Sequence, residues 1–191
     1  MKIVINPDNL VPNEEFQTFH KVRVILENSQ GQFAISNEGG KCIFPGGKRE
    51  KNETDLQAIQ REVKEETGIS LKESDFLELL ELETLYKNFY DYRSKSLKPR
   101  FTSTIYYYAK CSDEINTENM NLSPGEISEN FSIAFVNKEQ LVKLLSKDHS
   151  ASVNGNFFDE ENKIILDNVL SVIFKHSTPP KPVSDPDFDD R

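Results

Sequence analysis

Three glutamates in the middle of the chain, Glu62, Glu65 and Glu66, have the type and spacing to bind a hard metal ion. On a helix, residues three and four positions apart share one face, so these carboxylates would converge. Like charges at this spacing destabilise an isolated helix by roughly a few tenths of a kcal/mol per pair. A divalent cation between them removes the repulsion, and Mg²⁺ prefers carboxylate oxygens. Taken alone, the cluster also fits a solvated acidic surface.

The segment 54–67 has the pattern of an amphipathic helix that would hold the three glutamates. Thr54 and Gln57 have the spacing of a capping box at its amino end. Gly68 suits the left-handed conformation that ends a helix. The cluster would therefore be supported on one side and open to a substrate on the other. The residues that form the opposite, apolar face are Leu56, Ile59 and Val63.

A longer motif surrounds the glutamates. From Gly47 the sequence GKREKNETDLQAIQREVKEETGI fits G-x5-E-x7-R-E-U-x-E-E-x-G-U, with U aliphatic, at every specified position. Given this composition, a chance match is on the order of one in ten million. The segment from Gly47 to Ile69 resembles the Nudix box, the signature of the MutT-like hydrolases. The resemblance extends over roughly residues 21–145.

The resemblance implies an enzyme that depends on Mg²⁺, with Mn²⁺ as a substitute. Its substrate would be a nucleoside diphosphate linked to another moiety, cleaved by attack of a metal-activated water on phosphorus. In the family pattern Glu62 and Glu66 correspond to the principal metal ligands. Glu65 corresponds to a further ligand or a catalytic base, and the carbonyl of Gly47 completes the inner shell.

The resemblance also implies two features outside the metal ligands. Arg61 is expected to pair with Glu53 and to hold the loop on the helix, a supporting role in catalysis. Many family members add an acid from a late loop, for which Glu126 and Glu129 are candidates. Glu129 is favoured as a metal ligand by its distance from Phe135. The alternative is that both are ordinary surface acids.

The segment 86–100 is rich in both basic and aromatic residues. Arginine and lysine bind phosphates, and aromatic rings stack on bases. We expect this segment to line the substrate cleft and to bind the part of the ligand away from the scissile bond. The alternative is a solvated loop whose rings pack into the core. The candidate substrate-binding residues are Tyr86, Arg93, Lys95 and Arg100.

Alternation and helical spacing predict strands, a helix, strands and two helices in that order. The hairpin-like elements at the start disfavour an all-parallel sheet, so we expect an α/β fold with a mixed sheet. The resemblance implies the Nudix-type α/β/α sandwich. Residues 1–177 would form one domain, and the Pro- and Asp-rich residues 178–191 a flexible tail. The expected strands are 20–27, 32–36, 76–86, 101–110 and 131–136, and the expected helices are 54–67, 137–147 and 159–175.

The composition restricts the partners. With 191 residues and a net charge of −9, the chain is a poor candidate for binding a nucleic-acid polymer. No segment approaches the ~20 apolar residues of a membrane span. Two cysteines without metal-ligand spacing, Cys42 and Cys111, indicate a reduced, cytoplasmic protein. The oligomeric state stays open, with a homodimer among the options.

Two classes of function fit the motif. The first is the hydrolase, and the second is a non-catalytic Nudix-fold module that binds or senses a nucleotide. A binding module has no need of all three helix glutamates, so the intact box favours the hydrolase.

Overall fold

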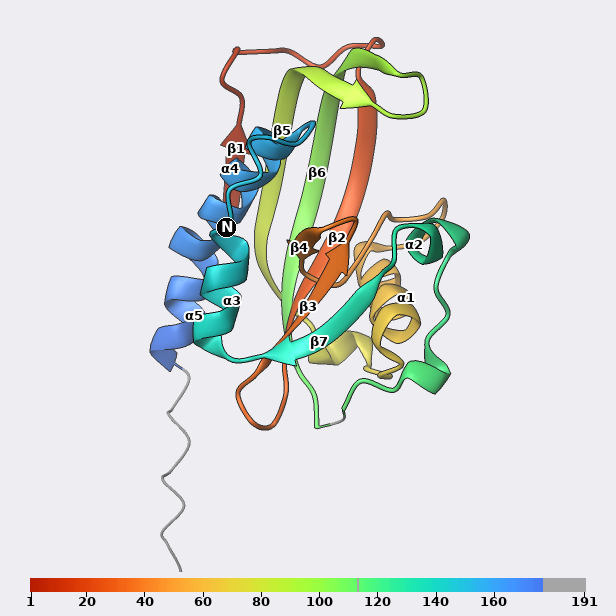
Figure 1. The fold of residues 1–191 in the computed structure, drawn as a ribbon, viewed down its shortest axis with the longest axis vertical. Helices are drawn as coiled ribbons and strands as arrows, with labels where there is room; N and C mark the ends of the chain where they lie inside the picture. Colours follow the sequence, from red (N-terminus) through yellow and green to blue (C-terminus); the bar gives the residue numbers. More distant parts are fainter. Residues whose placement is uncertain (113, 177–191) are drawn as a thin grey trace, which may run out of the picture.

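Seven strands form a mixed sheet at the centre of the computed structural model (Figure 1). The structure describes residues 1–112 and 114–176, and the expected tail at 178–191 lies outside them. The strands are β1 (Lys2–Ile5), β2 (Gln17–Glu27), β3 (Phe33–Glu38), β4 (Lys41–Ile43), β5 (Leu77–Asp91), β6 (Ser96–Lys110) and β7 (Ser132–Val136). Their order is β1-β5-β6-β2-β3-β4, and β7 also pairs with β3. β1 is parallel to β5 and β2 to β6, and the other pairs are antiparallel.

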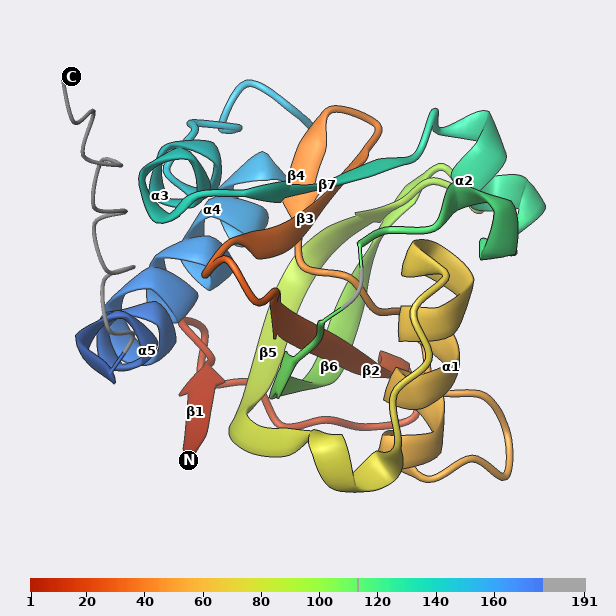
Figure 2. The same ribbon diagram turned by 90° about the horizontal axis from the view of Figure 1, so that it is seen from below.

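Helices cover both faces of the sheet (Figure 2). They are α1 (Asp55–Thr67), α2 (Pro124–Ser128), α3 (Lys138–Leu145), α4 (Gly155–Ile165) and α5 (Ser171–His176). A π-helical turn, Leu166–Leu170, joins α4 to α5. α1 lies on one face, and α3, α4 and α5 lie together on the other. This layering confirms the expected α/β sandwich with a mixed sheet.

The alternation of side chains along β2 divides the apolar core in two. Val22 and Val24 are fully buried on the α1 side, where they pack with Ile59 and Val63. Ile25 points to the opposite side and belongs to the core beneath the carboxyl-terminal helices. β2 therefore fixes the position of α1 and of those helices relative to one sheet.

Some segments differ from the expected elements. Residues 3–5, to which the sequence assigned no strand, belong to β1 and extend the sheet edge beside β5. Residues 86–100 belong to a hairpin rather than a loop, because the pairing of β5 with β6 continues to Asp91 and Ser96. The last helical segment begins at Gly155 instead of residue 159 and is interrupted by the π turn. The polar stretch before residue 125 contains a short 3-10 turn, Thr117–Asn119.

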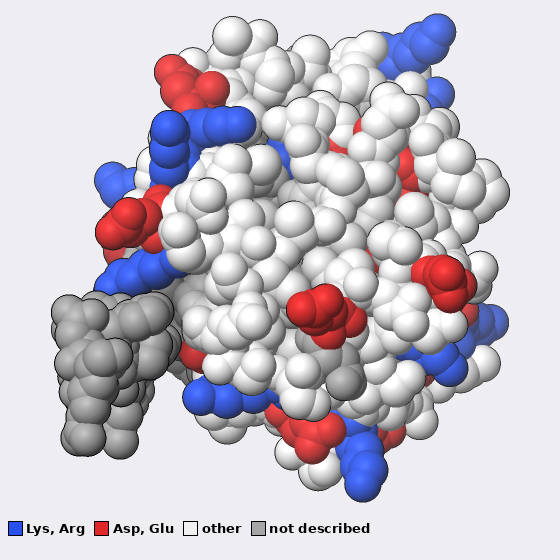
Figure 3. All heavy atoms as spheres, turned by 60° about the horizontal axis from the view of Figure 1, so that its bottom comes forward, with Lys and Arg blue, Asp and Glu red and all other residues white. Residues whose placement is uncertain are grey.

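Charges of both signs are interspersed on the end of the molecule seen in Figure 3. Lysine and arginine side chains lie there among aspartates and glutamates, around a broad uncharged area. The net charge of −9 is therefore not gathered into one patch on this face. Within residues 1–112 and 114–176, no helix has the length and apolar character needed to cross a membrane.

Candidate functional site

Capping at both ends fixes helix α1. The Thr54 hydroxyl accepts a hydrogen bond from the Gln57 N–H at 3.1 Å, and the Gln57 carboxamide oxygen accepts one from the Thr54 N–H at 3.0 Å. At the other end Gly68 has a φ of 71°, and its N–H donates to the Lys64 carbonyl. The predicted capping box and helix stop are confirmed. They fix where the helix begins and ends. The positions of Glu62, Glu65 and Glu66 on it are therefore fixed as well.

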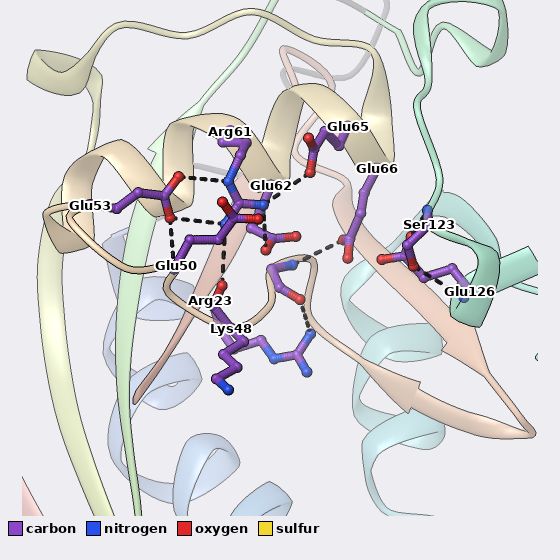
Figure 4. A network of polar contacts seen from close by, with 11 residues as sticks. Arg23, Lys48, Glu50, Glu53, Arg61, Glu62, Glu65, Glu66, Ser123 and Glu126 are labelled. Atoms are coloured by element: carbon purple, nitrogen blue, oxygen red, sulfur yellow. Dashed lines mark hydrogen bonds and ion pairs between the residues drawn. The ribbon is translucent and has the colours of Figure 1, made fainter. Parts of the chain in front are cut away.

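Three carboxylates from two helices meet at one point (Figure 4). Glu62 and Glu66 of α1 and Glu126 of α2 each place an oxygen within 4.8 Å of the others. Glu62 is 7% exposed and Glu66 1%. Burial raises the pKa of both carboxyl groups, and that of Glu66 lies well above its usual value. Burying such groups as anions is costly unless a cation accompanies them.

The donor atoms of this cluster fit a divalent cation. The Oε2 of Glu66 accepts a hydrogen bond from the Gly46 N–H at 3.0 Å, whereas its Oε1 is buried without a hydrogen-bond partner. A buried carboxylate oxygen without a partner, next to two further carboxylates, has the chemistry of a metal ligand. Because the donors are all oxygens, they suit Mg²⁺ or Mn²⁺ better than a metal that selects thiolates.

The loop before α1 packs closely at two glycines. Gly46 has a φ of 132°, and a Cβ there would lie 2.2 Å from the Val22 carbonyl oxygen. A Cβ on Gly47 would lie 2.5 Å from Oε1 of Glu62. The Gly47 carbonyl, a predicted metal ligand, accepts a hydrogen bond from the Val22 N–H at 2.9 Å. A carbonyl oxygen has two lone pairs, so one remains for a metal.

Arg61 binds the acids around the cluster (Figure 4). Its Nε and Nη2 donate to the two Glu53 oxygens at 2.7 and 3.1 Å, which confirms the expected contact. These hydrogen bonds raise the pKa of Arg61 and lower that of Glu53. Its Nη1 donates to Glu62 at 2.8 Å and to Glu65 at 3.0 Å, and its Nη2 also donates to the Lys48 carbonyl at 3.2 Å. Arg61 thus ties the loop to the helix, and it holds Glu65 outside the group of three converging carboxylates.

Of the two late acids, Glu126 lies within α2 and Glu129 directly follows it. The Ser123 hydroxyl accepts a hydrogen bond from the Glu126 N–H at 3.3 Å, and the Glu126 carboxylate accepts one from the Ser123 N–H at 2.5 Å. Glu129 follows the last residue of the helix, and its carbonyl accepts a hydrogen bond from the Gly39 N–H at 3.2 Å. The structure corrects the expectation for Glu129: the acid beside the box glutamates is Glu126. The reason is the short helix, which the sequence reading treated as a loop.

A cavity of about 530 Å³ lies between the sheet and α4. Its floor consists of alternate side chains from the neighbouring strands β5, β6 and β2. One wall comes from α4, and another from the β3–β4 turn together with Glu129. The charged lining residues are Lys21, Arg23, Glu38, Lys41, Arg100, Glu129 and Glu161.

Arg23 connects the cavity to the acid cluster. Its side chain lines the cavity, and its Nη1 donates to the carbonyls of Phe44 and Gly46 at 2.8 and 2.5 Å. Gly46 in turn donates its N–H to Glu66. A ligand at the cluster therefore has the cavity beside it.

The structure divides the predicted substrate-binding residues into two groups. Tyr86 and Arg100 line the cavity. Tyr86 is 2% exposed and stacks on Phe157 of α4, with the ring centroids 4.0 Å apart. Arg93 and Lys95 are exposed in the turn between β5 and β6 and do not line the cavity. The turn carries them away from it because the strands stay paired up to the residues that flank the turn.

The sequence reading missed Lys21, Arg23 and the α4 wall. The strand segment 20–27 contained a usable signal, because Lys21 and Arg23 alternate with the apolar Val22 and Val24. Lysine and arginine are mostly exposed in proteins, so two of them on one face of a central strand point to a functional role. The α4 residues carried no comparable signal, since their place depends on how the helix docks on the sheet.

The fold and the acid cluster together define a Nudix-type α/β protein, and comparison with known proteins agrees. Residues 19–157 match the NUDIX domain, and the chain belongs to this family. No curated protein matches the sequence significantly. Among solved structures it is similar to the MutT protein from Methanosarcina mazei, with 20% identity over 79% of this chain and 99% of that chain, and a TM-score of 0.48. It is also similar to the NUDIX domain of Shewanella oneidensis NrtR complexed with ADP ribose. That likeness has 15% identity over 83% of this chain and 94% of that chain, with a TM-score of 0.50, and it supports a shared fold.

Proposed function

We propose that the chain is a Mg²⁺-dependent pyrophosphohydrolase that cleaves a nucleoside diphosphate linked to another moiety. The observation that carries this proposal is the convergence of Glu62, Glu66 and Glu126 within 4.8 Å, with one buried oxygen of Glu66 unpaired. These carboxylates would hold Mg²⁺, with Mn²⁺ as a substitute. When bound, such an ion lowers the pKa of a coordinated water and neutralises charge on phosphoryl oxygens. Membership of the family supports hydrolysis of a phosphorus-containing anhydride.

The surrounding residues position this chemistry. Arg61 holds Glu62 and Glu65 at fixed places on α1 through hydrogen bonds of 2.8 and 3.0 Å. The Gly46 N–H binds one oxygen of Glu66 and leaves the other for a ligand. Glu65 lies at the partly exposed edge of the cluster, where it is our candidate for the base that acts on the attacking water.

The cavity supplies room for the rest of the substrate. Pockets for small molecules of this class commonly measure about 300–1,000 Å³, and this one measures about 530 Å³. The NUDIX domain of NrtR was solved with ADP ribose, which is a nucleoside diphosphate joined to a sugar. That ligand belongs to the class that we propose for this chain.

The proposal is tested by incubating the protein with a set of nucleoside diphosphate derivatives, first with Mg²⁺ and then with a chelator. We expect phosphate-bearing products only when metal is present. Glu66→Gln should abolish most of the activity, and Glu139→Gln, at an exposed position of α3, is the matched control. Binding of a derivative without turnover by the wild-type protein would favour the alternative, a non-catalytic nucleotide-binding or sensor module.

A further inference from the structure

Arg100 is a cation that forms no ion pair with an acid among residues 1–112 and 114–176. Its guanidinium lies between two aromatic rings, with Cζ 4.6 Å from the centroid of Phe19 and 3.8 Å from that of Phe89. Its Nη2 donates to the Gln17 side chain at 3.0 Å, and its Nε is buried without a hydrogen-bond partner. Burial lowers the pKa of Arg100, and Asp91, whose charge opposes this effect, forms no ion pair with it. Buried polar atoms usually have a hydrogen-bond partner, so the unpaired Nε of this partly buried arginine needs an explanation.

Lys21 is a second such cation on the floor of the same cavity. Within the part of the chain that the structure describes, its ammonium group makes no hydrogen bond or ion pair. Burial and the charges of Arg23 and Arg100 lower the pKa of Lys21 to about 8, even though Glu161 of α4 opposes the shift. The cavity therefore contains positive charge that its own acids do not fully neutralise.

Asn162 of α4 adds a third unpaired donor. The residue is 7% exposed and lines the cavity, and its Nδ2 is buried without a hydrogen-bond partner. It lies beyond residues 19–157, the part of the chain that matches the NUDIX domain. Arginine Nε, lysine Nζ and amide Nδ2 all donate hydrogen bonds. A ligand group that satisfies these three donors must present acceptors, whereas the edge of a nucleobase usually presents donors as well.

The positive side chains form a row along the sheet. Lys21 lies opposite Thr104 on β6, four residues from Arg100. At roughly 3.3 Å per residue, this offset is about 13 Å along the strands, a separation that two long side chains can bridge with an anion between them. Arg23 lies two residues beyond Lys21, beside the loop that contacts the acid cluster. The row leads from the acid cluster to the far end of the cavity.

We propose that the substrate carries a second anionic group besides the scissile diphosphate, and that Lys21, Arg100 and Asn162 bind that group in the cavity. This second site rests on the proposed function, because that function assigns the diphosphate to the acid cluster. A phosphate or a carboxylate supplies the acceptor oxygens, and an arginine with free donors binds either one strongly. The chemistry shared by both is a compact anion that is rich in acceptors.

The second anion is tested with substrate pairs that differ by one anionic group. NADP⁺ and NAD⁺ differ by a phosphate, and UDP-glucuronate and UDP-glucose differ by a carboxylate. We expect kcat/KM to be about tenfold or more higher for the anionic member of at least one pair, mainly through KM. A preference below twofold in both pairs overturns the inference. The pair that shows the preference identifies the anion as a phosphate or a carboxylate.

Variants connect the preference to the residues. Lys21→Gln and Arg100→Gln should each remove most of it. Lys21→Arg keeps the charge and should retain most of it, and Lys110→Gln removes an exposed charge at the end of β6 and should retain all of it. Thermal melting shows whether each variant is folded. A folded Lys21→Gln and a folded Arg100→Gln that both keep the full preference overturn the assignment.

The two proposals fail in different ways. Equal hydrolysis of both members of each pair overturns the second anionic group and leaves the hydrolase standing. If no member of either pair is hydrolysed, isothermal titration calorimetry with the same compounds decides the anion site by itself. Binding that is about tenfold tighter for an anionic member supports the site, and equal binding overturns it.

Discussion

The acid cluster and the cavity hold buried charge in opposite ways. At the cluster, Arg61 forms ion pairs with three glutamates, and the Gly46 N–H binds one oxygen of Glu66. One arginine thus faces several carboxylates, so negative charge is left over at the cluster, and one carboxylate oxygen of Glu66 has no hydrogen-bond partner. In the cavity, the side chains of Lys21 and Arg100 lie without ion pairs among the described residues. The cluster therefore has acceptors that suit a cation, whereas the cavity has donors that suit an anion.

The two regions also differ in how the chain builds them. Most of the cluster comes from residues 47–66, where helical spacing alone brings the carboxylates together. The cavity draws on β2, β5, β6, the β3–β4 turn and α4, so it exists only after the sheet and the last helices have packed. Substitutions at the cluster should therefore change turnover, and substitutions in the cavity should change KM and the choice of substrate.

The largest effect is expected from Glu62→Gln. The substitution is nearly isosteric and leaves the fold intact, but it removes a charged ligand from the cluster. We expect kcat to fall by about 10²–10⁴-fold while the melting temperature changes little. Steady-state kinetics and thermal melting measure the two quantities. A variant with near wild-type turnover would move the catalytic role to Glu65 or Glu126.

Substitutions of the two loop glycines, Gly46 and Gly47, should affect stability and turnover differently. In Gly46→Ala the new Cβ meets the Val22 backbone and the residue is strained at a φ of 132°, so we expect a loss of about 3 kcal/mol or more in unfolding free energy. In Gly47→Ala the Cβ meets only the side-chain carboxylate of Glu62, which can shift without moving the backbone. That variant should lose about 1 kcal/mol or less and yet lower kcat, because Glu62 leaves the cluster.

Chemical denaturation and kinetics together distinguish the two variants. Equal loss of stability in both would show that the region around Glu62 is structurally as rigid as the strand beneath Gly46. Wild-type turnover in Gly47→Ala would show that the position of Glu62 is not critical.

Mg²⁺ should raise the melting temperature by binding at the acid cluster, and residues of the cavity should not affect this shift. At a Mg²⁺ concentration about 100 times Kd, mass action adds about 2.7 kcal/mol, or roughly 5–10 °C in melting temperature for a chain of this size. Glu66→Gln should lose most of this shift, and Lys21→Gln should keep it. Thermal melting with and without Mg²⁺ gives both values. Equal shifts in the wild type and Glu66→Gln would locate the metal elsewhere.

The acid cluster could be predicted from the sequence better than the cavity could. The capping residues and the spacing of α1 are local, so the helix and its ends could be predicted from the residues, whereas the Arg61–Glu53 pair followed from the resemblance to the Nudix box. The choice of Glu129 over Glu126 was wrong because the sequence reading treated residues 123–128 as a loop, although Ser123 and Glu126 have the spacing of a capping box and Pro124 suits the first position of a helix. The hairpin at 86–100 was not predicted because its strands depend on pairing between segments rather than on their own composition. Asn162 could not be identified for the same reason, since only docking on the sheet buries it.

The smallest effect is expected from neutralising both charges of the β5–β6 turn. Composition alone suggested that Arg93 and Lys95 bind the substrate, but both are exposed and neither lines the cavity. Lys95 has a φ of 51°, so glutamine, with a similarly unbranched side chain, keeps the backbone cost unchanged. We expect the double variant Arg93→Gln, Lys95→Gln to keep KM and kcat within about twofold. Both charges are exposed outside the cavity, and solvent and salt screen their effect on a ligand inside it.

Arg100→Gln, on the cavity side of the same hairpin, is the matched comparison and should raise KM strongly for an anionic substrate. Kinetics at low and high salt complete the test, since long-range attraction by the turn would appear as a salt-dependent difference between wild type and double variant. If the double variant instead raises KM as much as Arg100→Gln does, the turn must fold onto the ligand. The binding region would then extend over the whole hairpin, and the boundary between a buried, specific cavity and an ordinary exposed turn would not hold.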